Sequence, residues 1–319
     1  MLKKIAESIR NNKNIIEKSE IDPIVQFINL NSFKSARIFT DIGEDSATIK
    51  NKDSYILITT DRIRTNFIET FPFGAGFSSI LVSIDDIYAC GGTPLAASLI
   101  MSFIDYNVGK EIIAGICAAS NKFQVPIIRG HTNPYGTCYE LSSTMVGEIR
   151  KEHYISAANA QVNDYIILAV DFDGRVGKAS KYYYDTTTFK NSIEILKKRK
   201  AMNLIAEKHL AHSSKDISNG GIFGTLLQLI KYSGVGANVN IDSILIPPNL
   251  INLNYTLDIY IQMYLTTSFI LTTPAHNCEQ MINIFKTYGL HAKVIGKIIK
   301  EKNLLIINNG KESLNVIRF

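Results

Sequence analysis

The sequence predicts a mixed α/β fold built from two halves, and three observations lead to this prediction. Short apolar runs typical of buried strands alternate with longer segments whose apolar residues recur at helical spacing. Small and polar residues gather where the strand runs end, which is where α/β proteins tend to place ligands. The two halves carry comparable sets of elements on either side of a small, polar stretch at residues 153–163. With 319 residues, the chain is long enough for two domains, which we expect at 1–155 and 156–319.

The composition fits a soluble globular protein and argues against several other classes. The chain is 46% apolar and 20% charged, with a mild net charge of +5. It has no dense basic patch interleaved with aromatic residues, so we expect no nucleic-acid surface. The N-terminus lacks the apolar core of a secretory signal, and no apolar run approaches the roughly 18 residues of a membrane span. The four cysteines lack CxxC spacing, which argues against a zinc site and for a reducing cytoplasm.

The first half is organised around one strand and the helix that follows it. The apolar run from Tyr55 to Thr60 is typical of a buried strand, and Asp61 comes directly after it. A helix is expected to begin near Gly74–Gly76 and to stop at Gly91–Gly92.

Two adjacent aspartates, Asp85 and Asp86, interrupt the apolar pattern of this helix. Aspartate is a poor helix-interior residue and is rarely buried without a partner. For Asp85, exposure to solvent and burial are equally good interpretations. Asp86 lies near the apolar stripe, two residues after Ile84 and four before Cys90. Because a buried carboxylate needs a cation or donors, Asp61 and Asp86 are candidate ligands of a hard metal ion such as Mg²⁺.

The rest of the first half alternates helices and strands. Residues 1–36 are expected to form one or two helices with polar faces, and Gly43–Asp45 a turn before a strand at Ala47–Ile49. Val125–Arg129 is expected to be a short strand that ends at Gly130, His131 and Thr132. The other predicted elements of this half are a strand at Leu95–Phe103, a helix at Glu111–Lys122 and a strand at Tyr139–Ile149.

The second half begins with a strand at Tyr165–Val170 and a loop that contains two glycines. This loop, Asp171–Lys181, could close over phosphates through Arg175, Lys178 or Lys181, but we favour a solvated surface loop. The later predicted elements are helices at Ser192–His209, Ile222–Tyr232 and Ala275–Tyr288, and strands at Asn238–Ile241, Ser268–Thr272, His291–Gly296 and Leu304–Ile307.

A glycine-containing turn, Ser214–Gly221, opens directly into the helix expected at Ile222–Tyr232. Asp216 and Ser218 are good residues for a helix N-terminus, and free N–H groups at such a terminus favour an anion.

Several short motifs, in this order, resemble the aminoimidazole ribonucleotide (AIR) synthase superfamily. This superfamily includes AIR synthase, thiamine-monophosphate kinase, selenophosphate synthetase and formylglycinamidine synthase. The resemblance runs from about residue 41 to residue 296. The matching segments are GEDSA at Gly43–Ala47, TTD at Thr59–Asp61, SIDDIYACGGTP at Ser83–Pro94, RGHT at Arg129–Thr132, GE at Gly147–Glu148 and DISNG at Asp216–Gly220.

The resemblance implies a fold, an assembly and a cofactor. Each half would be a mixed sheet packed on one side by helices, and two N-terminal halves would pair across their sheets into a homodimer. ATP would bind between sheets and helices. Mg²⁺ would be held by the family's aspartates, which fall on Asp45, Asp61, Asp86 and Asp216. Nucleotide contacts would come from Gly43, Gly130, His131 and Thr132 together with Asp45, Asp86 and Asp216.

The chain departs from the family's motifs at several positions, namely Glu44, Ser83, Asp85, His131 and Asn219. Selenophosphate synthetase also has histidine at the position of His131, but the Cys/Lys loop near its N-terminus has no counterpart here. Thiamine-monophosphate kinase would have aspartate in place of His131 and Asn219. The run from Lys215 to Ile222 is more similar to the AIR synthase-related branch, for which we have no established reaction.

These observations lead to three hypotheses about function. The first is an ATP- and Mg²⁺-dependent enzyme that phosphorylates or activates a small molecule, with Asp61 and His131 as catalytic residues. His131 suits acid/base chemistry or a phosphate contact, and a structural, hydrogen-bonded histidine is an equally good interpretation. The second is a nucleotide-binding maturation or regulatory protein without turnover, which the altered motif residues favour. The third is a thiamine-monophosphate kinase with drifted motifs.

Overall fold

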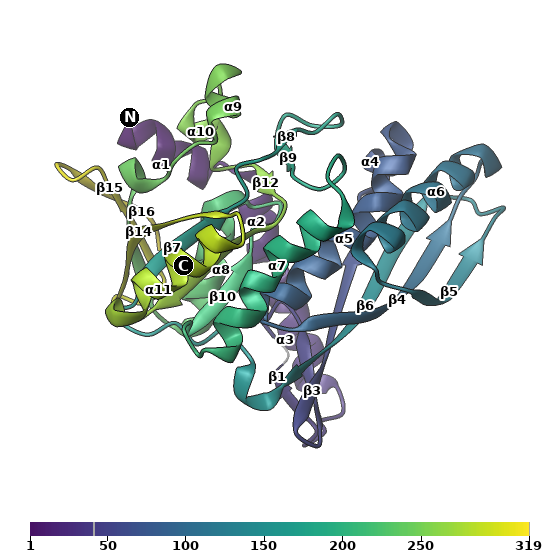
Figure 1. Cartoon of the computed structure of the whole chain (residues 1–319), viewed down its shortest axis with the longest axis horizontal. Helices are drawn as coiled ribbons and strands as arrows, with labels where there is room; N and C mark the ends of the chain where they lie inside the picture. The colour runs from purple at the N-terminus through teal and green to yellow at the C-terminus, as the bar shows by residue number, and fades with distance from the viewer. Residues whose placement is uncertain (41, 319) are drawn as a thin grey trace.

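The computed structural model describes residues 1–40 and 42–318, so residue 41, near the start of the family resemblance, lies outside the described residues. Two large mixed sheets dominate this part of the chain, and Figure 1 shows them next to each other with helices packed on both. The predicted α/β class is therefore confirmed. None of the described helices is long and apolar enough to cross a membrane.

The first sheet has six strands in the order β1-β2-β3-β6-β4-β5. They are β1 (Ile38–Thr40), β2 (Ala47–Asn51), β3 (Ser54–Arg62), β4 (Thr93–Ser102), β5 (Ile127–Asn133) and β6 (Glu140–Arg150). Gly130, His131 and Thr132 lie inside β5, so our expectation that the strand ends there was wrong. The reason is that parallel pairing with β4 continues through this segment, with Ile100 opposite His131.

Helices cover one face of the first sheet. They are α4 (Thr65–Thr70), α5 (Pro72–Ala89) and α6 (Tyr106–Phe123). Two glycines let α5 and α6 cross in backbone contact. A Cβ atom on Gly76 would lie 2.0 Å from the carbonyl oxygen of Ile112, and one on Gly115 would lie 2.0 Å from that of Phe73. This close crossing fixes α5, the helix that carries Asp85 and Asp86, on the sheet.

The second sheet has seven strands in the order β10-β13-β7-β14-β11-β15-β16. They are β7 (Tyr165–Val170), β10 (Ser213–Asp216), β11 (Gly236–Asn240), β13 (Ser268–Thr273), β14 (His291–Ile299), β15 (Leu304–Asn308) and β16 (Ser313–Arg318). Alternate residues of β7 enter two different cores: Ile167 packs in one, and Ile166 and Leu168 in the other.

Helices therefore cover both faces of the second sheet, whereas the expected one-sided packing describes the first sheet. Residues of α7 (Ser192–Glu207) and α11 (Cys278–Thr287) share a core with the first half. Residues of α8 (Gly221–Ser233) pack on the other face.

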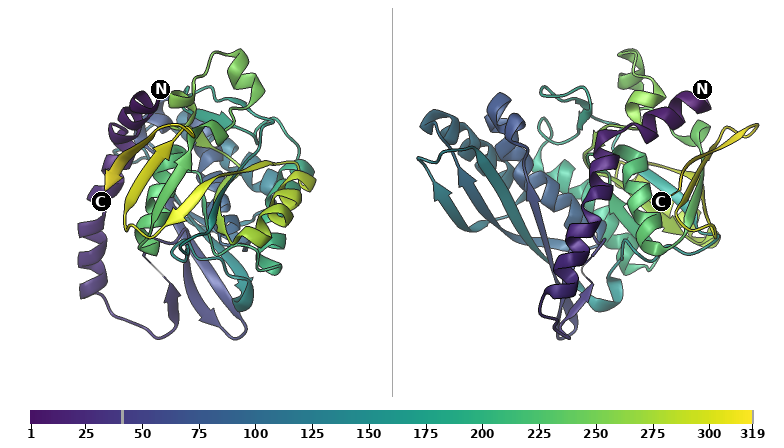
Figure 2. Two further views of the ribbon diagram at one scale, coloured as in Figure 1. Left: turned by 90° about the vertical axis from the view of Figure 1, so that its left-hand side faces the viewer. Right: turned by 180° about the vertical axis from the view of Figure 1, so that it is seen from behind.

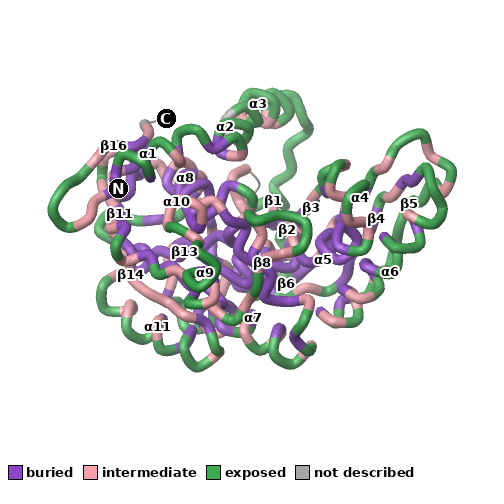
Figure 3. Tube along the Cα trace, turned by 90° about the horizontal axis from the view of Figure 1, so that it is seen from above, coloured by how far each residue is buried: buried purple, intermediate pink, exposed green. Residues whose placement is uncertain are grey.

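The N-terminal segment forms three helices, α1 (Leu2–Arg10), α2 (Lys13–Glu20) and α3 (Asp22–Asn31). Three helices form where we expected one or two, and α1 has the expected polar face, since Lys3, Lys4, Glu7 and Arg10 are exposed. Its other face buries Leu2, Ile5 and Ile9 in the core of the second sheet. Figure 2 shows this segment running from the second sheet to β1, and α3 is exposed along its length in Figure 3. Domain limits at 1–155 and 156–319 stay a prediction.

A small third sheet and several short helices complete the described structure. The sheet has the order β12-β9-β8, with β8 (Arg175–Val176), β9 (Tyr183–Asp185) and β12 (Tyr264–Leu265). The short helices are η1 (Lys151–His153), η2 (Ile241–Ser243), α9 (Pro248–Asn252), α10 (Leu257–Tyr260) and η3 (Ala275–Asn277).

Candidate functional site

Four aspartates that are far apart in the sequence meet between the two halves, and we call them the acidic centre: Asp45, Asp61, Asp86 and Asp216. Carboxylate oxygens of Asp45, Asp86 and Asp216 all lie within 4.8 Å of one another. Asp45 comes from the turn before β2, Asp61 from the end of β3, Asp86 from α5, and Asp216 from the end of β10. Carboxylate oxygens suit Mg²⁺, a hard cation that binds oxygen ligands from carboxylates, phosphates and water.

Two hydroxyl groups orient the carboxylates that β3 and α5 contribute. The Ser83 Oγ donates to Asp61 Oδ2 at 2.8 Å, and the Thr59 Oγ1 donates to Asp86 Oδ2 at 2.5 Å. Ser83 stands where the family's motif has asparagine. Despite this departure from the motif, Ser83 donates a hydrogen bond to the motif residue Asp61 and holds its carboxylate in position.

The structure resolves the two interpretations of Asp85 in favour of burial. Asp85 is only 2% exposed, and its carboxylate accepts from Nε of Arg199 at 2.8 Å and from the N–H of Thr267 at 3.1 Å. Asp86, the next residue of α5, faces a different direction and lines a cavity. The adjacent aspartates thus have different roles: Asp85 joins the two halves, and Asp86 belongs to the acidic centre.

Asp45 is held by the second half of the molecule. Its Oδ1 forms an ion pair with Nζ of Lys215, and its Oδ2 accepts from the N–H of Asp216 at 3.3 Å. The turn requires Gly43, which has a φ of +86° and sits against the ring of Tyr232, so any side chain there would clash.

Glu44, the first acid of this motif, turns away from the acidic centre. Its carboxylate accepts from Ser156 Oγ at 2.5 Å and from the N–H of Ala157 at 2.6 Å. Burial raises the pKa of Glu44, and these two donors lower it by a smaller amount. Glu44 therefore anchors the segment that connects the two halves.

The carboxylates of the acidic centre lie in an environment that disfavours negative charge. Burial, then the charges of Asp61, Asp216 and Asp45, raise the pKa of Asp86 well above its ordinary value. Burial, followed by Asp45, does the same to the pKa of Asp216, and burial raises the pKa of Asp61. Each group would ionise more readily beside a cation, and perturbed carboxyls in a cleft are typical of functional sites.

A cavity of about 610 Å³ opens beside the acidic centre, and both halves of the chain line it. Asp61, Asp86 and Asp216 are among its lining residues. Tyr264 also lines it and stacks on Tyr183 with ring centroids 5.6 Å apart. Tyr264 is 9% exposed, and its hydroxyl has no hydrogen-bond partner among the described residues. Several buried polar atoms of the described residues have no partner, and among them this hydroxyl belongs to a residue that lines the cavity, where a ligand would supply the hydrogen bond.

His131, Gly130 and Thr132 are exposed on the edge strand β5 and do not line this cavity. One row across the sheet runs from Arg62, at the cavity, through Ser142 and Ile100 to His131. Three strand spacings separate the two ends of this row, which is roughly 14 Å. Within one chain, the structure thus brings the four aspartates together and leaves His131 apart from them.

Two other regions differ from our expectations. Asp216 ends a strand, and α8 begins five residues later at Gly221, so the interpretation of Asp216 as a helix N-terminal residue was wrong. The loop that starts at Asp171 reaches the cavity with Ala179 and Ser180, although its Arg175 is bound to Asp185 and Thr188.

Sequence reasoning missed two lysines at the acidic centre. Lys215 directly precedes the motif residue Asp216, and that position was the sequence feature that could have revealed it. Burial lowers the pKa of Lys215, but the contact with Asp45 outweighs this effect and raises the pKa overall. Lys18 of α2 donates to Ser218 Oγ at 2.9 Å and to Gln228 Oε1 at 2.8 Å, and no sequence pattern connects it with the motifs.

Comparisons with known proteins agree with this architecture. The family model for the N-terminal domain of AIR synthase related protein matches residues 43–149, and the model for its C-terminal domain matches residues 181–307. An uncharacterized protein of Methanocaldococcus jannaschii is 33% identical over 98% of this chain and 96% of its own length.

Two further relatives carry names with a defined chemistry. The thiamine-monophosphate kinase of Buchnera aphidicola is 25% identical over 92% of this chain and 95% of its own length. The structure of T. maritima PurL complexed with ADP superimposes with a TM-score of 0.71 at 16% identity, which shows a shared fold. The match covers 87% of this chain and 45% of PurL, so this chain spans about half of that protein. The chain therefore belongs to the AIR synthase related protein family, with both family domains present.

Proposed function

We propose that the protein is an ATP- and Mg²⁺-dependent enzyme that phosphorylates or activates a small molecule. The observation that carries this proposal is that carboxylates of Asp45, Asp86 and Asp216 come together at a cavity of about 610 Å³, which Asp61 also lines. Cavities of this size are typical of small-molecule sites. Kinship with thiamine-monophosphate kinase supports a nucleotide as one of the ligands.

The acidic centre would bind Mg²⁺ together with the phosphates of ATP. Mg²⁺ neutralises phosphate charge and stabilises the transferring phosphoryl group. Asp61, Asp86 and Asp216 would hold the ion at the cavity, and Ser83 and Thr59 would keep two of these carboxylates in position. The hydroxyl of Tyr264 would donate to the bound ligand, because burial raises its pKa and keeps it protonated.

We further propose that two copies pair through the face of the first sheet that α5 and α6 leave open. Ile100 is 50% exposed on this face, in the same row as His131. His131, Gly130 and Thr132 could contact phosphates only in such an assembly, because their strand lies too far from the cavity of its own chain. Their role stays a prediction that depends on the dimer.

Nucleotide binding without turnover is the second candidate. It is favoured by the fact that no histidine lines the cavity within the described residues, so a general base of that type is missing from a single chain. This form of the protein would bind ATP and Mg²⁺ and leave the nucleotide intact.

A direct test is to follow ATP over time with and without Mg²⁺, alone and with a panel of small phosphate acceptors. An enzyme should release ADP, either with an acceptor or slowly to water, and Asp61→Asn should abolish the release. Stable ATP in the presence of demonstrated binding would contradict the enzyme proposal and favour the binding protein.

Thiamine monophosphate belongs in this panel because of the 25% identical relative. Formation of thiamine diphosphate would identify the protein as a thiamine-monophosphate kinase. No product at high protein concentration would exclude this activity, which His131 and Asn219 already disfavour as departures from that enzyme's motifs.

A further inference from the structure

The acidic centre contains a buried cation of its own. The side chains of Lys215 and Asp45 are 7% and 5% exposed and form an ion pair. The second oxygen of Asp45 accepts from the N–H of Asp216. Both oxygens of Asp45 are therefore engaged, and Asp45 does not line the cavity, unlike the other three aspartates of the centre.

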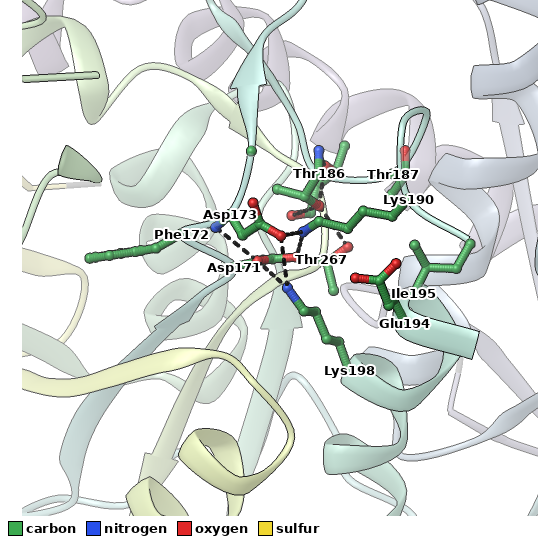
Figure 4. A network of polar contacts seen from close by, with 12 residues as sticks. Asp171, Phe172, Asp173, Thr186, Thr187, Lys190, Glu194, Ile195, Lys198 and Thr267 are labelled. Carbon is green, nitrogen blue, oxygen red and sulfur yellow. Dashed lines mark hydrogen bonds and ion pairs between the residues drawn. The ribbon is translucent and has the colours of Figure 1, made fainter. Parts of the chain in front are cut away.

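A second ion-pair cluster, around the buried Asp171 and Lys190, shows an arrangement in which lysines match the carboxylates. In Figure 4, Asp171 and Asp173 face Lys190 and Lys198. Nζ of Lys190 lies 2.7 Å from Asp171 Oδ2, and Nζ of Lys198 lies 2.6 Å from Asp171 Oδ1. Two carboxylates meet two ammonium groups, so the charges balance and no further ion is needed.

The acidic centre is not balanced in this way. Lys215 matches the charge of Asp45, and Lys18 lies nearby on Ser218. Lys215 leaves three carboxylates without an ion-pair partner, and the nearby charge of Lys18 reduces the net charge of the centre to −2, which one divalent cation would balance. The three carboxylates without an ion-pair partner are those that line the cavity, and Tyr264, whose hydroxyl has no hydrogen-bond partner among the described residues, lines the same cavity.

We propose that Lys215 is a built-in counter-ion of Asp45, so that the protein's side chains hold a single divalent cation through Asp61, Asp86 and Asp216. This inference rests on the proposed Mg²⁺ site and adds its stoichiometry and a positioning residue. Lys215 occupies the side of Asp45 where a second ion would otherwise bind. It also fixes the turn before β2 to β10, because it joins residues from both halves.

The test is a titration of the full chain with Mn²⁺ in the absence of nucleotide, followed by calorimetry and by the electron paramagnetic resonance of free Mn²⁺. The wild type should bind one ion per chain. Lys215→Met should bind a second ion or bind the first at least about tenfold more tightly, because Asp45 then adds an unmatched negative charge. Asp45→Asn should weaken binding by about tenfold, because Lys215 then adds an unmatched positive charge.

The double variant Lys215→Met with Asp45→Asn removes both charges and should bind Mn²⁺ within about threefold of the wild type, which is the expected outcome when two effects cancel. Lys190→Met is the matched control, since it also removes a buried, ion-paired lysine but lies in the balanced cluster. It should leave Mn²⁺ binding unchanged. Circular dichroism of each variant establishes that it is folded.

Two ions bound to the wild type would overturn the inference without any variant. A wild type with one ion and a Lys215→Met variant with unchanged affinity and stoichiometry would also overturn it, while leaving the proposed Mg²⁺ site intact. A wild type that binds no Mn²⁺ would overturn the metal site itself, and the inference with it.

Discussion

At the scale of single residues, Asp86 is the clearest case of a side chain kept for a ligand at a cost in stability. Burial and three neighbouring carboxylates raise its pKa well above the ordinary value. We expect Asp86→Asn to raise the free energy of unfolding of the metal-free protein by about 0.5–2 kcal/mol, a usual gain when a strained site residue is relieved. Urea denaturation in a chelating buffer measures this free energy. A loss of stability in Asp86→Asn would contradict the view that the buried Asp86 carboxyl destabilises the metal-free protein.

The same residue predicts a pH dependence. A carboxyl whose pKa is raised in the folded state binds more protons there than in the unfolded chain, so its contribution to stability falls as pH rises from 3.8 through the folded-state pKa. The difference in the free energy of unfolding between Asp86→Asn and the wild type should therefore be small near about pH 4 and should grow toward about pH 8. Saturating Mg²⁺ should stabilise the wild type selectively. An advantage that is constant with pH would argue against the raised pKa.

Sequence reasoning identified the aspartates of the acidic centre because each stands in a short motif or beside an apolar stripe. It missed Lys215 as a partner of Asp45, because a pair 170 residues apart leaves no periodic pattern. It left Asp85 undecided for the same reason: its partner Arg199 lies on a helix of the other half. Local sequence patterns indicate which acidic residues stand in an unexpected apolar context, whereas the tertiary structure determines which basic residue pairs with each of them.

At the scale of elements, α5 and α7 are joined by one buried ion pair. The guanidinium of Arg199 is 0% exposed, donates to Asp85, and lies 4.9 Å from the centroid of the Phe123 ring. Asp85→Asn leaves this guanidinium without a counter-ion, so we expect a loss of about 3 kcal/mol in the free energy of unfolding.

The neighbouring substitution provides the control for this prediction. Asp85→Asn should retain Mg²⁺ binding, because Asp85 faces Arg199, whereas Asp86→Asn should lose it without a loss of stability. Equal effects of the two substitutions on metal binding, measured by calorimetry, would contradict the different roles assigned to Asp85 and Asp86.

Strand and helix positions were mostly predictable from apolar periodicity, and the exceptions have a common cause. The polar strand Ser213–Asp216 was not predicted, because its residues resemble a turn and its place in the sheet depends on pairing with β13. In the same way, β5 continues through Gly130–Thr132 because β4 supplies hydrogen-bond partners. Pairing between distant strands overrides local propensity in both cases.

At the scale of the whole molecule, the open face of the first sheet predicts a dimer. Ile100 is 50% exposed on this face. Ile193, which is 79% exposed on α7 and does not belong to the first sheet, serves as the control position. We expect the wild type and Ile193→Glu to be dimers and Ile100→Glu to be a monomer, because a buried, unpaired carboxylate at an interface is costly. Sedimentation velocity measures this. A monomeric wild type, or a dimeric Ile100→Glu variant, would contradict the proposed assembly.

The central claim is that both halves of the chain build one Mg²⁺-dependent nucleotide site around the acidic centre. The most direct measurement is the calorimetric titration of ATP into the wild type and Asp86→Asn, each with and without Mg²⁺. The account predicts that the wild type binds ATP only with Mg²⁺. It also predicts that Asp86→Asn is folded but binds ATP at least about tenfold more weakly in the presence of Mg²⁺, because one charged metal ligand is lost. Equal ATP binding by both proteins, or no binding by either, would contradict it.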